Sequence, residues 1–153
     1  MVKHPPVSNL EDHVGYWLRF VSNHVSYAFT EKVEAHGVTV AEWVLLREML
    51  QLGPVNPSQL AAELGMTRGA ISKLIERLCS KSLAERTSPA SDRRYQVVEL
   101  TAAGRKLVPV LARLADENDR EFFGHLAVNQ RRELLAFLQD LVERHKWIDV
   151  PVS

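Results

Sequence analysis

The middle of the chain limits the possible folds most strongly, because two short helical segments there are separated by only two residues. The first, Pro57–Leu64, has apolar residues at helical spacing, and Thr67 is a favourable N-cap residue for the second. Gly65 and Met66 between them fit only a tight turn. The second segment carries a single apolar stripe, formed by Ile71, Leu74, Ile75 and Leu78. Two short helices joined in this way must share one core and leave their outer faces exposed.

Two segments of strand-forming residues follow these helices. Leu83–Thr87 and Tyr95–Leu100 are each predicted to be β-strands, and Ser88–Asp92 between them is rich in turn-forming residues. Together they predict a β-hairpin. Two short helices followed by a hairpin make a winged helix-turn-helix, and the second helix of a helix-turn-helix lies in the major groove of DNA.

Longer amphipathic segments precede this module. Apolar residues from Leu10 to His36 recur at intervals of three and four, which predicts a long helix that stops at Gly37. Thr39 is expected to start a second helix, because Glu42 three residues later completes a capping box. Gly53 should end that helix.

Two further helices are predicted after the hairpin. Thr101 should cap the first, and Pro109 inside it should kink the helix or remove one backbone hydrogen bond. Gly124 marks an interruption, and the last helix is expected to start near Asn129. Its apolar residues form a heptad seam of Leu134, Leu138, Leu141, His145 and Ile148. We expect this seam to pack against a second subunit, and packing within one subunit remains the alternative.

The expected fold class is mainly α with a small β-wing, a winged helix-turn-helix with N- and C-terminal dimerisation helices. Residues 1–9 should form a flexible arm, and residues 10–153 a single domain. Within that domain, residues 10–52 and 101–148 would form the helical dimerisation region, and residues 55–100 the DNA-binding module.

The charge of the chain is distributed unevenly along the sequence. The formal net charge is zero, but residues 57–106 carry four more basic than acidic side chains, and the segment on either side carries two more acidic than basic ones. Affinity for DNA comes largely from Lys and Arg side chains that neutralise phosphates. The imbalance therefore favours a DNA-binding surface in the middle of the chain, although many solvated faces carry as much charge.

The second helix of the module offers several side chains to DNA if its apolar stripe faces the core. Arg68 and Lys73 can bond to guanine or to a phosphate, and Gly69 lacks the bulk that would keep the helix out of the groove. Each of these residues alone is equally typical of a solvated helix face. The predicted DNA contacts of the helix and the first strand are Thr67, Arg68, Gly69, Ser72, Lys73, Arg77 and Arg86.

The predicted hairpin tip adds three charged residues that cannot reach a core. Arg93 and Arg94 follow the proline-containing turn, and a narrow, negative minor groove attracts arginine side chains. Asp92 would be repelled by phosphate, so we expect it to orient an arginine through a charge-assisted hydrogen bond.

In this order, these motifs resemble the MarR family of regulators. The run Ser91–Gly104 is similar to the family pattern D-x-R … L-T-x-x-G, and Leu60–Thr67, Ile71–Leu78 and Leu83–Arg86 fit the same family. The similarity extends from about Leu10 to Ile148, which is nearly the whole chain.

The resemblance implies a homodimer that represses transcription at a pseudo-palindromic operator until a small ligand relieves repression. It also implies that Arg94 enters the minor groove, that Asp92 holds it, and that Arg93 contacts phosphate or shares the role of Arg94. Ser82 departs from the family, which usually has glycine at this point. Because a non-glycine residue in the left-handed region costs roughly 1 kcal/mol, the turn after the second helix is expected to differ.

Family members often bind phenolic or other aromatic carboxylates, so the resemblance also implies a small aromatic ligand. Such a site needs aromatic surface with a few polar groups. A histidine beside an apolar face is more often a core residue, and Trp43 also fits the core better than a pocket. The candidate ligand-binding residues are Tyr16, Trp17, Phe20, His24, Tyr27, Trp43 and Arg47.

Several other classes of protein are not supported. The chain has no run of 18 apolar residues and no signal-peptide pattern, so no membrane partner is expected. Its single cysteine fits a cytoplasmic location. It lacks a phosphate-binding loop and a nucleophile elbow, so we expect neither an enzyme nor a cofactor. His13 and His24 would lie about 16 Å apart along a helix, too far to share a metal ion. Cys79 leaves a redox role open.

Two alternatives to a ligand-controlled repressor remain at this point. One is a MarR-like interaction module that has lost operator binding, and the other is a constitutive regulator without a ligand. The arginine pair Arg93 and Arg94 argues against the first alternative.

Overall fold

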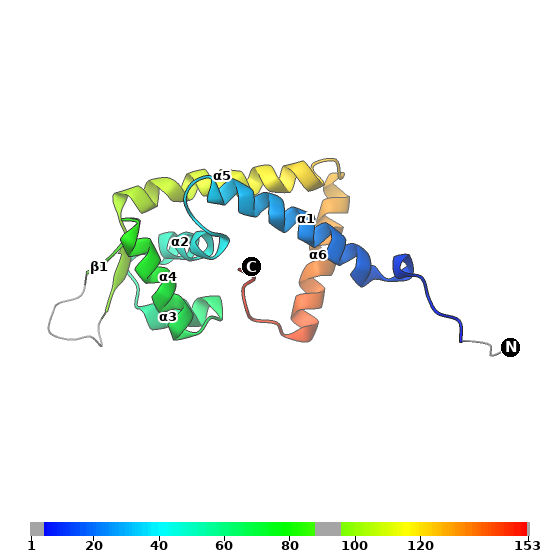
Figure 1. The fold of residues 1–153 in the computed structure, drawn as a ribbon, viewed down its shortest axis with the longest axis horizontal. Helices are drawn as coiled ribbons and strands as arrows, with labels where there is room; N and C mark the ends of the chain where they lie inside the picture. Colours follow the sequence, from blue (N-terminus) through cyan, green and yellow to red (C-terminus); the bar gives the residue numbers. More distant parts are fainter. Residues whose placement is uncertain (1–4, 88–95, 153) are drawn as a thin grey trace.

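The computed structural model describes residues 5–87 and 96–152, and it is mainly helical with one small two-stranded sheet (Figure 1). This confirms the expected fold class. In chain order the elements are η1 (Leu10–Asp12), α1 (Val14–Glu34), α2 (Val40–Leu52), α3 (Pro57–Leu64), α4 (Arg68–Ser80), β1 (Ala84–Arg86), β2 (Val98–Leu100), α5 (Ala102–Phe123) and α6 (Val128–His145).

The first long helix begins later than the sequence predicts. Leu10–Asp12 form a separate 3-10 turn, because His13 has extended backbone angles that interrupt the helical path. The indole N–H of Trp17 donates to the carbonyl of Glu11 at 2.9 Å and so fastens this turn to α1. Gly37, at φ 79°, then takes the chain out of the helix as predicted.

Helix α2 starts at the predicted capping box. The Glu42 N–H donates to Thr39 Oγ1 at 3.1 Å, and Glu42 Oε2 accepts from the Thr39 N–H at 3.2 Å. Two backbone donors of the first turn are thereby satisfied. Gly53 ends the helix with φ 71°.

Helices α3 and α4 form the predicted pair around a left-handed Gly65 with φ 60°. Asn56 caps α3 through a bond from the Ser58 N–H to its side-chain oxygen at 2.7 Å. A Cβ added to Gly65 would lie 2.8 Å from the carbonyl oxygen of Ile148, so the end of the chain passes close against this turn.

The sheet is a short antiparallel hairpin in which Ala84 pairs with Leu100 and Arg86 with Val98. Both strands are shorter than predicted, and Tyr95, where the second strand was expected to start, lies outside the described residues. Gly104, in the first turn of α5, lies against this hairpin, because a Cβ there would clash with the carbonyl oxygen of Leu83.

Helix α5 continues through Pro109, whose missing N–H removes one hydrogen bond from the helix, as predicted. It runs beside α1 along the upper side of the molecule in Figure 1. Lys32 of α1 donates to Asn118 Oδ1 at 3.0 Å, and the buried Asn118 amide donates to the carbonyl of Val25 at 3.2 Å. The two long helices are thus joined by polar contacts as well as by packing.

The shared core lies between α2, α4, the hairpin and the first half of α5. It includes the predicted stripe of α4 together with side chains from every neighbouring element. The largest fully buried apolar side chains are Leu45, Leu46, Met49, Leu60, Ile71, Ile75, Leu78, Leu111, Val33, Val38 and Val98.

Helix α6 turns away from the end of α5 and has little contact with its own chain (Figure 1). None of its residues, all of which the structure describes, is buried. The helix ends at His145 because Lys146 is left-handed, with φ 53°. Ile148 therefore lies beyond the helix, 79% exposed, and the prediction that it continues the heptad seam is wrong.

Candidate nucleic-acid interface

Helix α4 has two chemically different faces. Ile71, Leu74, Ile75 and Leu78 are buried in the core, as the stripe predicts. Thr67 caps the helix by accepting a hydrogen bond from the Ala70 N–H at 3.2 Å. Because the apolar face is fixed against the core, the opposite face of α4 must point to solvent.

The predicted DNA-contacting residues gather on this outer face and at its start. They lie within about three turns of one helix, so their side chains form one continuous polar surface, which carries three basic residues and the exposed Glu76. All six are exposed: Thr67, Arg68, Gly69, Ser72, Lys73 and Arg77. A surface of this kind is able to contact both phosphates and base edges.

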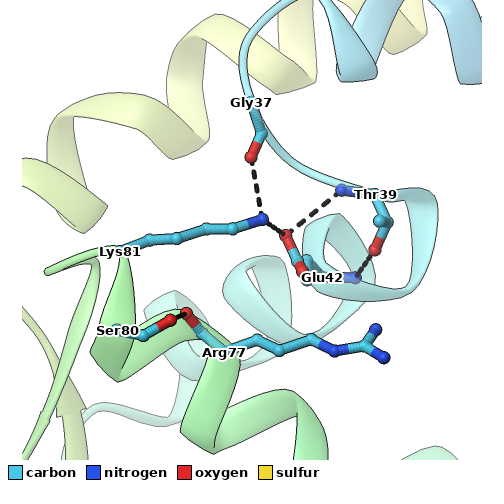
Figure 2. Close-up of polar contacts among 6 residues, drawn as sticks. All are labelled: Gly37, Thr39, Glu42, Arg77, Ser80 and Lys81. Atoms are coloured by element: carbon cyan, nitrogen blue, oxygen red, sulfur yellow. Dashed lines mark hydrogen bonds and ion pairs between the residues drawn. The ribbon is translucent and has the colours of Figure 1, made fainter.

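Two further features concern Arg77 at the end of this surface and Arg86 on the first strand. Arg77 extends its guanidinium away from Lys81 in Figure 2, while its main-chain carbonyl accepts a hydrogen bond from Ser80 Oγ at 2.7 Å. Arg86 is exposed on β1, at the end of the strand that leads to the hairpin tip. Asp92, Arg93 and Arg94 lie outside the described residues, and their roles stay predictions.

An ion pair between a buried glutamate and an exposed lysine behind α4 was not predicted from the sequence. Lys81 follows the last residue of α4 and approaches Glu42 of α2, with Nζ 2.7 Å from Oε2 (Figure 2). The sequence showed Glu42 only as part of a capping box, and nothing local links it to a lysine 39 positions later. Only the folded arrangement brings these two side chains together.

The turn between α4 and β1 keeps the conformation that glycine favours, although Ser82 occupies it. Ser82 has φ 58°, and its N–H donates to the carbonyl of Cys79 at 3.0 Å. The next N–H, that of Leu83, donates to the carbonyl of Leu78 at 2.9 Å, as in a Schellman motif. The expectation that this turn would differ because of Ser82 is therefore wrong.

The candidate ligand-binding residues are only partly brought together. Trp17, Phe20 and His24 line a groove of about 880 Å³ between α1, the end of α5 and α6. His24 stacks on Phe20 at a ring distance of 4.9 Å, and its Nδ1 lies 2.8 Å from the carbonyl of Phe20. Phe122 and Leu138 close the groove from the other helices.

The other four candidates lie elsewhere. Tyr16 packs edge-on against Trp17, beside the groove. Tyr27 is exposed, and a hydrogen bond to Glu31 together with the charge of that carboxylate raises the pKa of its phenol. Trp43 packs against the core, and Arg47 is exposed on α2.

In the described part of the chain, no helix is both long and apolar enough to cross a membrane.

Comparison with known proteins identifies the module. Residues 36–94 match the sequence model of the MarR family. Over 135 residues the chain is 23% identical to the HTH-type transcriptional repressor NicR of Pseudomonas putida, and the match covers 88% of this chain and 85% of NicR.

Solved structures share the fold over most of their length. A probable transcriptional regulator from Pseudomonas aeruginosa superposes with a TM-score of 0.73 at 28% identity, covering 87% of this chain and 99% of the other. BpsR of Bordetella bronchiseptica, described in a structural study of the regulation of its DNA binding by 6-hydroxynicotinic acid, superposes with a TM-score of 0.74 at 23% identity, covering 89% and 97%.

The match over residues 36–94 covers the exposed face of α4, and the shared fold extends over the long helices on both sides. The family consists of transcriptional regulators and not of enzymes. The chain therefore has the fold of winged-helix transcriptional regulators, and its residues 36–94 are similar to the MarR family.

Proposed function

We propose that this chain is a cytoplasmic, homodimeric repressor that binds a pseudo-palindromic duplex DNA site through α4 and releases it when a small aromatic acid binds. The observation that carries the proposal is the outer face of α4. Polar and basic side chains are grouped there on a helix whose other face is fixed in the core.

The arrangement on α4 fits direct reading of bases in the major groove. Arg68 and Ser72 lie in the first turns of the helix, which reach base edges in a helix-turn-helix complex. Gly69 leaves space for close approach, and a Cβ added to it would meet nothing within 4 Å. Lys73 and Arg77, farther along, suit phosphate contacts that position the helix.

The predicted wing residues extend this surface in the proposal. By resemblance to the family, Arg94 enters the minor groove, Asp92 orients it, and Arg93 contacts phosphate or shares the minor-groove role. Arg86 stands at the described end of β1 and supplies a further basic group on the same path.

The homodimer is supported by apolar surface that a single chain leaves uncovered. On α6, Phe137 is 70% exposed, and Leu138 and Leu141 are about two-fifths exposed. On α1, Trp17 and Phe20 are each about half exposed. A second copy that packs on both helices would cover these residues and would hold two α4 helices about 34–36 Å apart, one turn of DNA.

A ligand site for an aromatic acid is supported by the groove beside α1. Its walls are mostly apolar, and His24 supplies a polar group that can pair with a carboxylate. BpsR, whose DNA binding is regulated by 6-hydroxynicotinic acid, shares the fold and suggests this chemical class.

The test is a binding titration with labelled DNA from upstream of the gene for this protein. Sequence-selective binding that weakens steeply with salt would support the proposal, and Lys73→Gln should lower the salt slope by about 1 if Lys73 contacts a phosphate. Absence of binding even at low salt would overturn it in favour of an interaction module. Binding that no aromatic acid weakens would instead indicate a constitutive regulator.

A further inference from the structure

The side chain of Glu42 is buried at the start of α2, with only 1% of its surface exposed. A buried carboxylate is costly unless it is paired and hydrogen-bonded. Glu42 Oε2 accepts from the Thr39 N–H at 3.2 Å and from Lys81 Nζ at 2.7 Å. The first bond is the capping interaction, which a neutral glutamine would also make. The negative charge of the Glu42 side chain is therefore needed only for its ion pair with Lys81.

Lys81 connects three separate segments through one ammonium group. It stands at the C-cap of α4, and its Nζ bonds to Glu42 of α2 and, at 2.9 Å, to the carbonyl of Gly37 (Figure 2). Gly37 lies in the turn that follows the end of α1. The end of α4 is thereby tied both to the start of α2 and to the turn that follows α1.

By charge alone, Lys81 would be counted among the residues that contact phosphate. The structure gives it another role, because two of the three N–H donors of its ammonium are directed to the buried carboxylate of Glu42 and to the carbonyl of Gly37, although the lysine side chain is 37% exposed. It also lies at the end of α4 opposite the turns that begin at Arg68 and approach the bases.

We propose that Lys81 and Glu42 are positioning residues for DNA recognition: their ion pair, in which only the carboxylate is buried, fixes the angle of α4 against α2 and so presents the outer face of α4 to the groove. This inference rests on the proposed DNA binding through α4. The proposal assigns to Lys81 contacts with Glu42 and Gly37 of its own chain in place of a contact with DNA.

The direction in which Glu42→Gln changes the affinity for DNA separates a positioning role from an effect of charge alone. Glu42→Gln removes a negative charge from α2, next to the basic module, so an effect of charge alone would strengthen DNA binding. Loss of the positioning pair would weaken it, by roughly three- to tenfold, which is within the range of couplings measured for contacting residues. Glu63→Gln is the matched control, since Glu63 is exposed on α3 and its substitution changes the charge equally.

The salt dependence of binding separates positioning from phosphate contact. Lys81→Met should weaken binding by roughly tenfold at every salt concentration and leave the slope of log affinity against log salt unchanged. Lys73→Gln, on the outer face of α4, should lower that slope by about 1. The two lysines are thus expected to differ in slope although each variant loses one positive charge.

Lys81→Met leaves the Glu42 carboxylate buried without its partner and can destabilise the fold. The double variant Glu42→Gln with Lys81→Met avoids an unpaired charge, and its thermal unfolding shows whether the protein is folded at the assay temperature. If the two residues act as one unit, the double variant binds DNA no more weakly than the weaker single variant, so the double-mutant cycle is strongly non-additive.

The outcomes separate the failure of this inference from that of the proposed function. If the parent protein binds no DNA, the proposed function fails and the inference with it. The inference alone is overturned if the parent binds DNA and Lys81→Met lowers the salt slope as Lys73→Gln does. It is likewise overturned if Glu42→Gln strengthens binding as Glu63→Gln does, or if folded Glu42 and Lys81 variants bind with parental affinity.

Discussion

Ser82 occupies a left-handed turn directly after α4, where the resemblance to the family implied glycine. The turn forms nonetheless, because the Leu83 N–H bonds back to Leu78 and the Ser82 carbonyl accepts a hydrogen bond from Thr101 Oγ1 at 2.7 Å. Contacts on both sides of the residue therefore hold a backbone conformation that serine disfavours.

Replacing Ser82 with glycine should stabilise the protein by up to about 1 kcal/mol, because the strain at φ 58° disappears while the unfolded chain gains some freedom. The measurement is urea unfolding followed by circular dichroism. Ser80→Gly is the control, since Ser80 lies within α4, where glycine should destabilise. An unchanged or lower free energy of unfolding for Ser82→Gly would contradict the argument.

Arg94→Ala should weaken operator binding by on the order of 1–3 kcal/mol if this arginine enters the minor groove. The salt titration used for the lysine variants provides the measurement. Arg113→Ala on α5, an exposed arginine outside the basic module, is the control. Equal affinities of Arg94→Ala and the parent would refute the minor-groove role.

Residue-level features were predictable from the sequence where their partners are local. The capping box of Thr39 and Glu42 and the N-cap of Thr67 depend on residues three positions away, and both are present. The pairing of Glu42 with Lys81 was not predictable, because it depends on how α4 packs on α2. Trp43 and Arg47 were grouped with the α1 aromatics by composition, and the fold places them on a different helix away from the groove.

At the scale of elements, the helices were predicted well and the strands less well. Helix periodicity extends over many residues and the caps mark the ends, so α2, α3 and α4 begin where the sequence predicts. The strands contain three residues each, too few for alternation to define their ends. The end of α6 was misjudged because heptad spacing continues to Ile148, although Lys146 leaves the helix.

Leu138→Asp should dissociate the proposed dimer, because it places a carboxylate in the apolar face of α6 that the second copy would cover. Sedimentation velocity should show a shift from dimer to monomer. Ala136→Asp is the matched control, since Ala136 lies on the opposite side of the same helix and is exposed. An unchanged sedimentation coefficient for Leu138→Asp would contradict a dimer through this face.

At the scale of the whole molecule, the order of the modules was predictable from the sequence. The packing of the long helices α1, α5 and α6 on one another was not. Helix α5 connects the two regions: its first half packs against the winged helix, and its last residues, Phe122 and Phe123, line the groove with α1 and α6. Lys32 of α1 bonds to Asn118 of α5, so two of the helices that line the groove are also joined by a polar contact.

An aromatic acid that binds the groove should raise Tm, because a ligand that binds only the folded state stabilises it by about 2.7 kcal/mol at one hundred times its Kd. The measurement is thermal unfolding with 6-hydroxynicotinic acid and related acids, with the corresponding uncharged alcohols as controls. His24→Phe should abolish the preference for the acids while retaining the aromatic wall. Equal shifts with acids and alcohols would contradict a carboxylate partner at His24.

The close approach of the chain end to Gly65 has a practical consequence for anyone who purifies this protein. The Val150 N–H bonds to the carbonyl of Leu64 at 3.4 Å, and Ile148 lies against the turn that joins α3 to α4. A purification tag fused after Ser153 would start three residues after this contact with α3, the helix directly before the one that is proposed to read DNA. A tag at the N-terminal end is the better choice for operator-binding measurements, because η1 lies far from α3 and α4 in Figure 1.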